Sequence, residues 1–110
     1  MRPMIKLCLC DDRGEKFFGP GPYRLLCGIE EKGSLRAAAA DMGMAYSKAI
    51  AILHHAEAQL GFPLTCRKIG GSGGGGSVLT GQAKELMKNY AEYESACNRA
   101  CRDLFEKYFP

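Results

Sequence analysis

The side chains that could perform chemistry in this 110-residue chain are mainly thiols, because it has six cysteines. Cys8 and Cys10 are separated by one residue, and Cys97 and Cys101 by three. Four thiolates can hold a zinc ion, so these residues could form a metal site or a redox sensor if the two ends of the chain meet. Neither spacing is that of a zinc knuckle, however, and Cys97 and Cys101 fall on an apolar helical face, where cysteine is an ordinary small hydrophobic residue. We therefore expect free thiols, no bound metal and no cofactor, with a thiol-based metal or redox sensor as the alternative.

The two histidines, His54 and His55, are adjacent in the sequence. Neighbouring side chains on a helix point about 100° apart, so these two cannot chelate one metal ion together. No Ser/His/Asp or Cys/His arrangement can be identified, and a core this small leaves little room for a catalytic pocket. We do not expect an enzyme.

A glycine tract, GGSGGGG, occupies residues 70–76. It is not a nucleotide-binding P-loop, because no Lys-Ser or Lys-Thr follows the last glycine. An artificial flexible linker has a similar composition. The tract also suits the tip of a β-hairpin, where Arg67 and Lys68 just before it could reach phosphate groups.

Hydrophobic periodicity predicts the elements that must position these residues. From the N-terminus the pattern predicts a strand over 4–12, a turn over 13–16 and a helix from the Gly-Pro pairs at 19–22 up to Gly33. A short helix through Leu35 to Met42, capped by Ser34, and a helix over about 45–60 follow. Extended segments over 63–69 and 77–79 then precede a last helix that Thr80 caps and that ends at about Tyr108. We expect one domain over 1–110, with an N-terminal strand and turn (1–19), a core (20–80) and a long helix (80–110).

The segment between Gly33 and Leu60 predicts two helices joined by a tight turn. Ser34 is a suitable N-cap, and Gly43 suits the turn. The second helix has an apolar stripe of Ala49, Ile52, Leu53, Ala56 and Leu60, and an opposite face with Ser47, Lys48, Ala51, His54 and His55. This pattern is typical of a helix-turn-helix whose second helix enters the major groove of DNA, with the following hairpin as a wing. A helical pair that binds nothing is the alternative at this point.

The last helix would be roughly 40 Å long, which exceeds what so small a core can cover. Part of its apolar stripe should therefore contact a second chain. The residues expected at this dimer interface are Leu86, Tyr90, Tyr93, Cys97, Cys101, Leu104 and Tyr108.

Composition is that of an ordinary globular domain, with 46% hydrophobic and 25% charged residues. The formal net charge of +3 permits a nucleic-acid partner but does not demand one. No apolar run approaches the roughly 18 residues of a membrane span. Lys6, Asp11 and Asp12 interrupt any export signal at the N-terminus, so we expect a cytoplasmic protein with no membrane partner.

Two stretches resemble the N-terminal DNA-binding domain of ModE-type, molybdate-responsive transcription regulators, a winged-helix group related to LysR-type DNA-binding domains. They are GSLRAAAADMGMAYSKA at 33–49 and CRKIGGSGGGGSVLT at 66–80. The resemblance covers about residues 21–93, and the glycine-rich stretch followed by Val-Leu-Thr is its most specific part. It argues against an artificial linker.

The resemblance implies a fold that is mainly α with a small β component: a winged helix-turn-helix with an N-terminal strand, a Gly-rich β-hairpin wing and a long C-terminal dimerisation helix. It implies a homodimeric, bacterial-type transcription regulator that binds a palindromic operator in double-stranded DNA. A protein–protein interaction module is a further alternative.

Family positions at the helix starts match Ser34, Tyr46, Ser47 and Lys48, and the wing matches Arg67 and the glycine tract. The expected DNA-binding residues are Ser34, Arg36, Tyr46, Ser47, Lys48, Ile50, Ala51, His54, Arg67, Lys68, Gly71, Gly73 and Gly74. Ile50 stands where the family usually has tryptophan. The chain ends at Pro110, which leaves no room for the family's molybdate-binding domain, so we expect no molybdate site.

Overall fold

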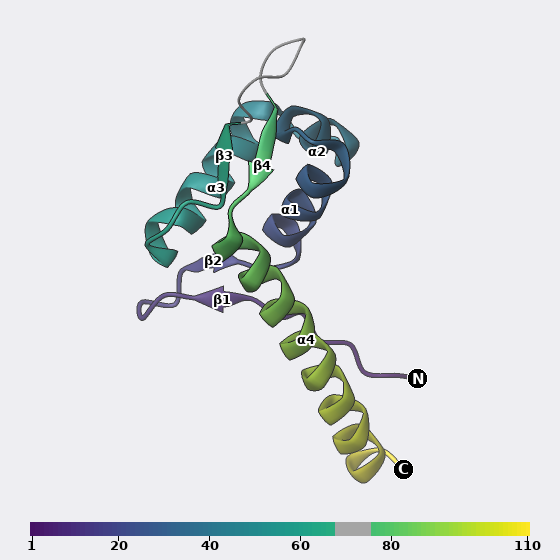
Figure 1. Cartoon of the computed structure of the whole chain (residues 1–110). Helices are drawn as coiled ribbons and strands as arrows, with labels where there is room; N and C mark the ends of the chain where they lie inside the picture. The colour runs from purple at the N-terminus through teal and green to yellow at the C-terminus, as the bar shows by residue number, and fades with distance from the viewer. Residues whose placement is uncertain (68–75) are drawn as a thin grey trace.

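The computed structural model describes residues 1–67 and 76–110. Along these two stretches the elements are β1 (Leu9–Cys10), β2 (Lys16–Phe18), α1 (Pro20–Lys32), α2 (Leu35–Asp41), α3 (Tyr46–Leu60), β3 (Thr65–Arg67), β4 (Ser77–Leu79) and α4 (Gly81–Tyr108). β1 pairs with β2 and β3 with β4, both antiparallel. Helices α1 to α3 and the β3–β4 pair gather into one body, from which α4 extends (Figure 1). The predicted fold class, mainly helical with small hairpins and a long last helix, is confirmed.

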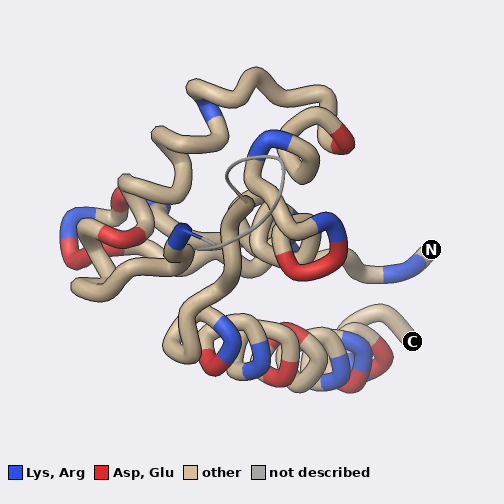
Figure 2. The backbone as a smooth tube through the Cα atoms, turned by 45° about the horizontal axis from the view of Figure 1, so that its top comes forward, with Lys and Arg blue, Asp and Glu red and all other residues tan. Residues whose placement is uncertain are grey.

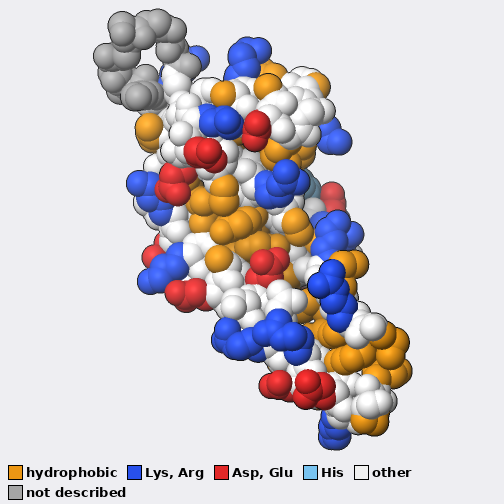
Figure 3. Space-filling view, turned by 90° about the vertical axis from the view of Figure 1, so that its right-hand side faces the viewer, with side chains coloured by type: hydrophobic (Ala, Val, Ile, Leu, Met, Phe, Trp, Pro, Cys, Tyr) orange, Lys and Arg blue, Asp and Glu red, His pale blue; other side chains and the backbone are white. Residues whose placement is uncertain are grey.

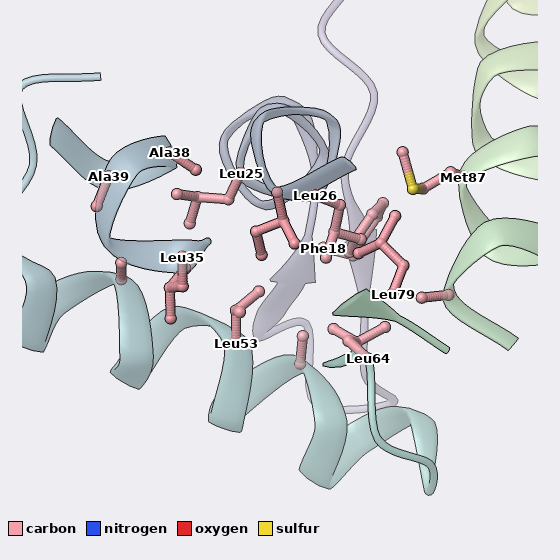
Figure 4. Packing of buried hydrophobic residues seen from close by; sticks show 14 of the residues in the cluster. Phe18, Leu25, Leu26, Leu35, Ala38, Ala39, Leu53, Leu64, Leu79 and Met87 are labelled. Carbon is pink, nitrogen blue, oxygen red and sulfur yellow. The ribbon is translucent and has the colours of Figure 1, made fainter. Parts of the chain in front are cut away.

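The core is centred on α1. Leu25 and Leu26 are fully buried, and Figure 4 shows them between α2, α3 and the strand β4. The remaining buried members are Phe18, Ile29, Leu35, Ala38, Ala39, Ala49, Leu53, Ala56, Leu64, Leu79, Ala83, Met87 and Tyr90. These residues come from helices α1 to α4, from β2 and β4, and from Leu64 just before β3. One hydrophobic cluster therefore fixes the positions of α2, α3 and the β3–β4 hairpin relative to one another.

The closest helix contact lies between α1 and α2. A Cβ atom added to Gly28 would lie 2.7 Å from the Cβ of Ala38, a distance that side chains do not tolerate. The short side chains of the alanines in α2 allow this close crossing, and Ala38 and Ala39 are each only 1% exposed. Gly28 is the partner that the sequence pattern did not reveal, because nothing local distinguishes it from a tolerated helical glycine.

The predicted boundaries of the helical pair are confirmed. The Ala37 N–H donates to the Ser34 Oγ at 3.0 Å, which caps α2. Gly43 adopts a φ of 65° in the turn before α3, a conformation that glycine reaches without strain. Local capping and turn chemistry therefore set this part of the fold, as the sequence indicated.

The β3–β4 hairpin is attached at its base to both flanking helices. The Leu64 N–H donates to the Glu57 carboxylate of α3 at 2.7 Å. The Thr80 N–H donates to the Leu64 carbonyl oxygen, and the Thr80 hydroxyl oxygen accepts from the Ala83 N–H and caps α4. The predicted hairpin tip, with Lys68, Gly71, Gly73 and Gly74, lies outside the described residues.

The predicted N-terminal strand over 4–12 is wrong for most of its length, because only Leu9–Cys10 forms a strand. Asp11 explains the early end, since its Oδ1 accepts hydrogen bonds from the Arg13 and Glu15 N–H groups, each at 2.9 Å, and closes a turn. The short β2 that follows leaves residues 4–8 without a strand partner, and they run beside α4 instead. Contact with α4 therefore takes the place of the strand pairing that the alternation of apolar and polar residues predicted.

α4 has 28 residues and begins against the core, where Ala83, Met87 and Tyr90 are buried. Its C-terminal half continues beyond the body, and the molecule is consequently 58 Å long but only 29 by 25 Å across. Among the described residues, no helix is both long enough and apolar enough to cross a membrane.

Candidate nucleic-acid interface

Helix α3 carries six of the thirteen predicted DNA-binding residues. Ser47, Ala51 and His54 are exposed, on the side opposite the buried Ala49 and Leu53. At about 100° per residue these three side chains share one face, with Tyr46 on one flank and Lys48 on the other. This face of α3 is therefore exposed to solvent.

Ile50 differs from its neighbours on this face. Its side chain is partly buried and packs against the hydrophobic core. It lies on the same flank of α3 as Tyr46, about 40° from it around the helix. Ile50 therefore contributes to packing at the edge of the exposed face.

His55 points away from His54, as their adjacency requires. The Nε2 atom of His55 lies 3.1 Å from the Lys16 carbonyl oxygen and 3.6 Å from a carboxylate oxygen of Glu15. His55 therefore joins α3 to the β1–β2 hairpin. This role was not predicted, because Lys16 is 39 positions away in the sequence and Glu15 is its neighbour.

A cation–π contact joins α2 to α3. The Arg36 guanidinium carbon lies 4.1 Å from the centroid of the Tyr46 ring. Arg36 is exposed, and the Tyr46 side chain is 39% exposed. Arg36 and Tyr46, which were predicted as two separate DNA-binding residues, therefore contact each other on the surface.

A backbone hydrogen bond joins the start of α2 to the hairpin. The Ser77 N–H donates to the Gly33 carbonyl oxygen at 3.0 Å. Ser77 pairs with Arg67 across the hairpin, and Gly33 precedes Ser34, the N-cap of α2. The end of the hairpin strands at Arg67 and Ser77 and the start of α2 are therefore held side by side, at the end of the molecule opposite the tip of α4 (Figure 1).

Charge is distributed unevenly between the body and α4. Five basic and five acidic side chains occur in α4, and Figure 2 shows both signs alternating along this helix. The formal net charge of +3 therefore belongs to the remainder of the chain. A surface that binds a polyanion is expected where the excess positive charge lies, which favours the body over α4.

The cysteines are not assembled into a metal site. Cys8, Cys10, Cys97 and Cys101 are all free, and in residues 1–67 and 76–110 no group of three or more His, Cys, Asp or Glu side chains could hold a metal ion. The alternative of a four-thiolate site within one chain is therefore contradicted.

An open apolar groove of about 670 Å³ lies along the C-terminal half of α4. Its lining is formed by Pro3 and Ile5 of the N-terminal segment with Cys97, Ala100, Cys101, Leu104, Phe105, Tyr108 and Phe109 of the C-terminal part. Leu104 is 54% exposed and Tyr108 is 66% exposed. Figure 3 shows hydrophobic side chains gathered at this end of the molecule. Among the other predicted interface residues, Tyr93 is exposed, and Cys97 and Cys101 are half-buried.

Tyr90 corrects the predicted interface. It is 3% exposed, and its ring packs edge-on against Phe18 with centroids 5.2 Å apart. Burial raises the pKa of the Tyr90 hydroxyl above its ordinary value, and the nearby Glu94 carboxylate adds to the effect. Tyr90 belongs to the core of its own chain, because the N-terminal segment and β2 cover the part of α4 where it lies. Leu86 is also partly buried against this core.

The fold is similar to that of a known DNA-binding domain. The crystal structure of the CbnR DNA-binding domain in complex with DNA matches this chain with a TM-score of 0.57 and 19% sequence identity, over 73% of this chain and 86% of that chain. No protein-family model and no curated protein matches the sequence. At this identity the likeness concerns the fold, and the chain therefore has the winged-helix architecture found in a DNA-binding domain.

Proposed function

We propose that this chain is a ModE-like, LysR-like DNA-binding module of a transcription regulator that binds double-stranded DNA. The observation that carries the proposal is the physical connection of its three predicted contact elements. The Arg36–Tyr46 contact joins α2 to α3, and the Gly33–Ser77 hydrogen bond joins α2 to the wing. A winged-helix fold with these elements on one end suits simultaneous contact with a groove and its flanking backbone.

In this proposal α3 lies in the major groove. Ser47 and Lys48, in its first turn, contact base edges or phosphates, because N-terminal residues of a recognition helix reach deepest into the groove. Ser34 and Arg36 contact the DNA backbone, and Arg67 directs the wing toward the flanking groove. On the basis of the sequence, we also propose Lys68 and the glycines of the hairpin tip as DNA contacts.

The proposal includes a homodimer formed through α4. Stripe residues succeed one another at alternating spacings of four and three through Leu86, Tyr90, Tyr93, Cys97, Ala100 and Leu104, the pattern by which two helices pack side by side. Leu86 and Tyr90 are covered within the chain, Tyr93 is exposed, and Cys97, Ala100 and Leu104 line the open groove. A second copy of the same helix would cover the exposed half, and two recognition helices would then read a palindromic operator.

The direct test is a fluorescence-anisotropy titration of the whole chain with duplexes selected from a random pool, at two ionic strengths. Binding should weaken as salt rises, since each phosphate contact releases counterions. Lys48→Ala should weaken binding to all duplexes and reduce the salt dependence. Lys88→Ala is the matched control, because it removes the same charge from an exposed position on α4 and should leave binding unchanged.

Sequence specificity is tested in the same selection. Ser47→Ala should change the preferred bases, whereas Arg67→Ala should weaken binding without changing them. Half-sites separated by about one helical turn, roughly 34 Å, would report a dimer with two recognition helices. A dimer with no salt-sensitive affinity for any duplex would refute DNA binding and indicate a protein-interaction module instead.

A further inference from the structure

The exposed Arg36–Tyr46 pair has a geometry that suits an anionic ligand. The Arg36 guanidinium carbon lies 4.1 Å from the Tyr46 ring centroid, close enough for the planar cation to rest on the ring face. Such a contact uses the face of the guanidinium and leaves its N–H edges directed outward. Those edges form a fork that matches two oxygens of a phosphate.

Arg36 has no competing acidic partner in the described parts of the chain. The ion pairs there are Lys32 with Asp41 and His55 with Glu15. Asp41 is the acidic residue on α2, and it is directed to Lys32 at 3.9 Å rather than to Arg36. The aromatic ring is therefore what orders the Arg36 side chain, while its charge stays available to a ligand.

The position of the pair specifies which anion is within reach. Arg36 is in the first turn of α2, directly after the Ser34 cap, whose backbone neighbour Gly33 is bonded to the wing. The pair thus joins the start of the recognition helix to the first turn of α2, next to the point where the chain is hydrogen-bonded to the wing. In a winged-helix complex this position faces the sugar–phosphate backbone beside the major groove.

We propose that Tyr46 acts as a positioning residue: its ring holds the Arg36 guanidinium on a DNA phosphate, and the Tyr46 hydroxyl does not itself read a base. This inference rests on the proposed DNA binding and gives Tyr46 a role different from that of Ser47 and Lys48. Because the ring of phenylalanine offers the same face, the hydroxyl is dispensable. Because lysine lacks a planar fork, Arg36→Lys does not replace arginine.

The test compares Kd values of R36A, R36K, Y46F, Y46L and the double variant R36A/Y46L on the duplex selected with the wild-type chain. We expect R36A and Y46L each to weaken binding about tenfold, the size of one charge-assisted hydrogen bond. R36K should be weakened nearly as much, and Y46F should bind within about twofold of wild type. The double variant should be no weaker than R36A, because both changes remove the same contact.

Two further measurements separate a positioning role from a merely structural one. R36A should lower the slope of log K against log salt by about 0.9, the value for one phosphate. Selection from random duplexes should return the same bases with every variant. In the free protein, the Arg36 δ-CH₂ proton resonances should be shifted upfield by the ring in wild type and Y46F, and not in Y46L.

Distinct outcomes overturn the inference. Losses that multiply in the double variant, to about a hundredfold, would show that the two side chains contact DNA independently. A loss in Y46F equal to that in Y46L would show that the hydroxyl makes the contact. A changed base preference in R36A would show that Arg36 reads a base. If Y46L binds the duplex as tightly as wild type, only the positioning role of Tyr46 is refuted. If the wild-type chain shows no salt-sensitive binding to DNA, the proposed function is refuted as well.

Discussion

The Tyr90 hydroxyl donates a 2.8 Å hydrogen bond to the carbonyl oxygen of Leu7, 83 residues earlier in the chain. This bond attaches the N-terminal segment to α4 at the point where α4 leaves the body. The Tyr90 ring meanwhile contacts Phe18 and Tyr23, with centroids 5.2 and 5.1 Å away. Tyr90 thus links β2, α1 and the N-terminal segment to the long helix.

Removing this hydroxyl should destabilise the fold. Tyr90→Phe keeps the ring packing but leaves the Leu7 carbonyl oxygen without this donor, so we expect a loss of about 1 kcal/mol in the free energy of unfolding. Urea denaturation measures it. Tyr93→Phe removes the same group from a side chain that is 55% exposed and should have no effect. Equal stabilities of the two variants would contradict the structural role of Tyr90.

The same residue predicts a loss of stability at alkaline pH. Burial raises the pKa of the Tyr90 hydroxyl above its ordinary value of 10.0, with Glu94, Cys8 and Tyr23 adding to the effect. The unfolded chain therefore releases this proton at a lower pH than the folded chain, and stability falls as pH rises from 10.0 toward the folded pKa. Tyr23, whose pKa burial also raises, is present in both proteins. Between a pH below 10.0 and a pH above it, the urea midpoint should fall less in Tyr90→Phe than in wild type. Equal falls of the midpoint in the two proteins would refute the prediction.

Gly28 should be intolerant of a side chain. Gly28→Ala places a methyl group 2.7 Å from the Ala38 Cβ, so α2 must move away from α1. We expect destabilisation of about 1–3 kcal/mol, the usual cost of overpacking a core. Gly81→Ala is the control, because the added Cβ meets nothing within 4 Å at the start of α4. Thermal denaturation should therefore show a lower Tm for the first variant and an unchanged or higher Tm for the second.

The groove on α4 should be the site of self-association. Leu104→Glu places a charge among the apolar residues of the groove, and burying it in an interface would cost several kcal/mol. We expect a monomer in sedimentation velocity at concentrations where wild type is a dimer. Ala96→Glu introduces the same charge at an exposed position outside the groove and should leave the dimer intact. A wild-type chain that stays monomeric would exclude the proposed homodimer.

Local sequence chemistry alone determined the helical pair and the ends of the long helix. Ser34 and Thr80 cap the helices that follow them, and Gly43 makes the turn, as predicted. These features depend on residues within four positions of one another, so periodicity and capping preferences report them without knowledge of the fold. The exposed face of α3 follows from the same periodicity.

The tertiary structure decided which of the residues on a predicted face are buried, and which other segment buries them. Tyr90 and Tyr93 lie on the same predicted stripe, yet only Tyr90 is buried, because the N-terminal segment and β2 pack where it lies. His54 and His55 are neighbours, yet only His55 meets a backbone carbonyl of β2. Alternation in residues 4–8 predicted a strand, which needs a pairing partner that the short β2 does not provide. Periodicity identifies a face of an element, whereas burial requires a second surface whose position depends on contacts distant in sequence.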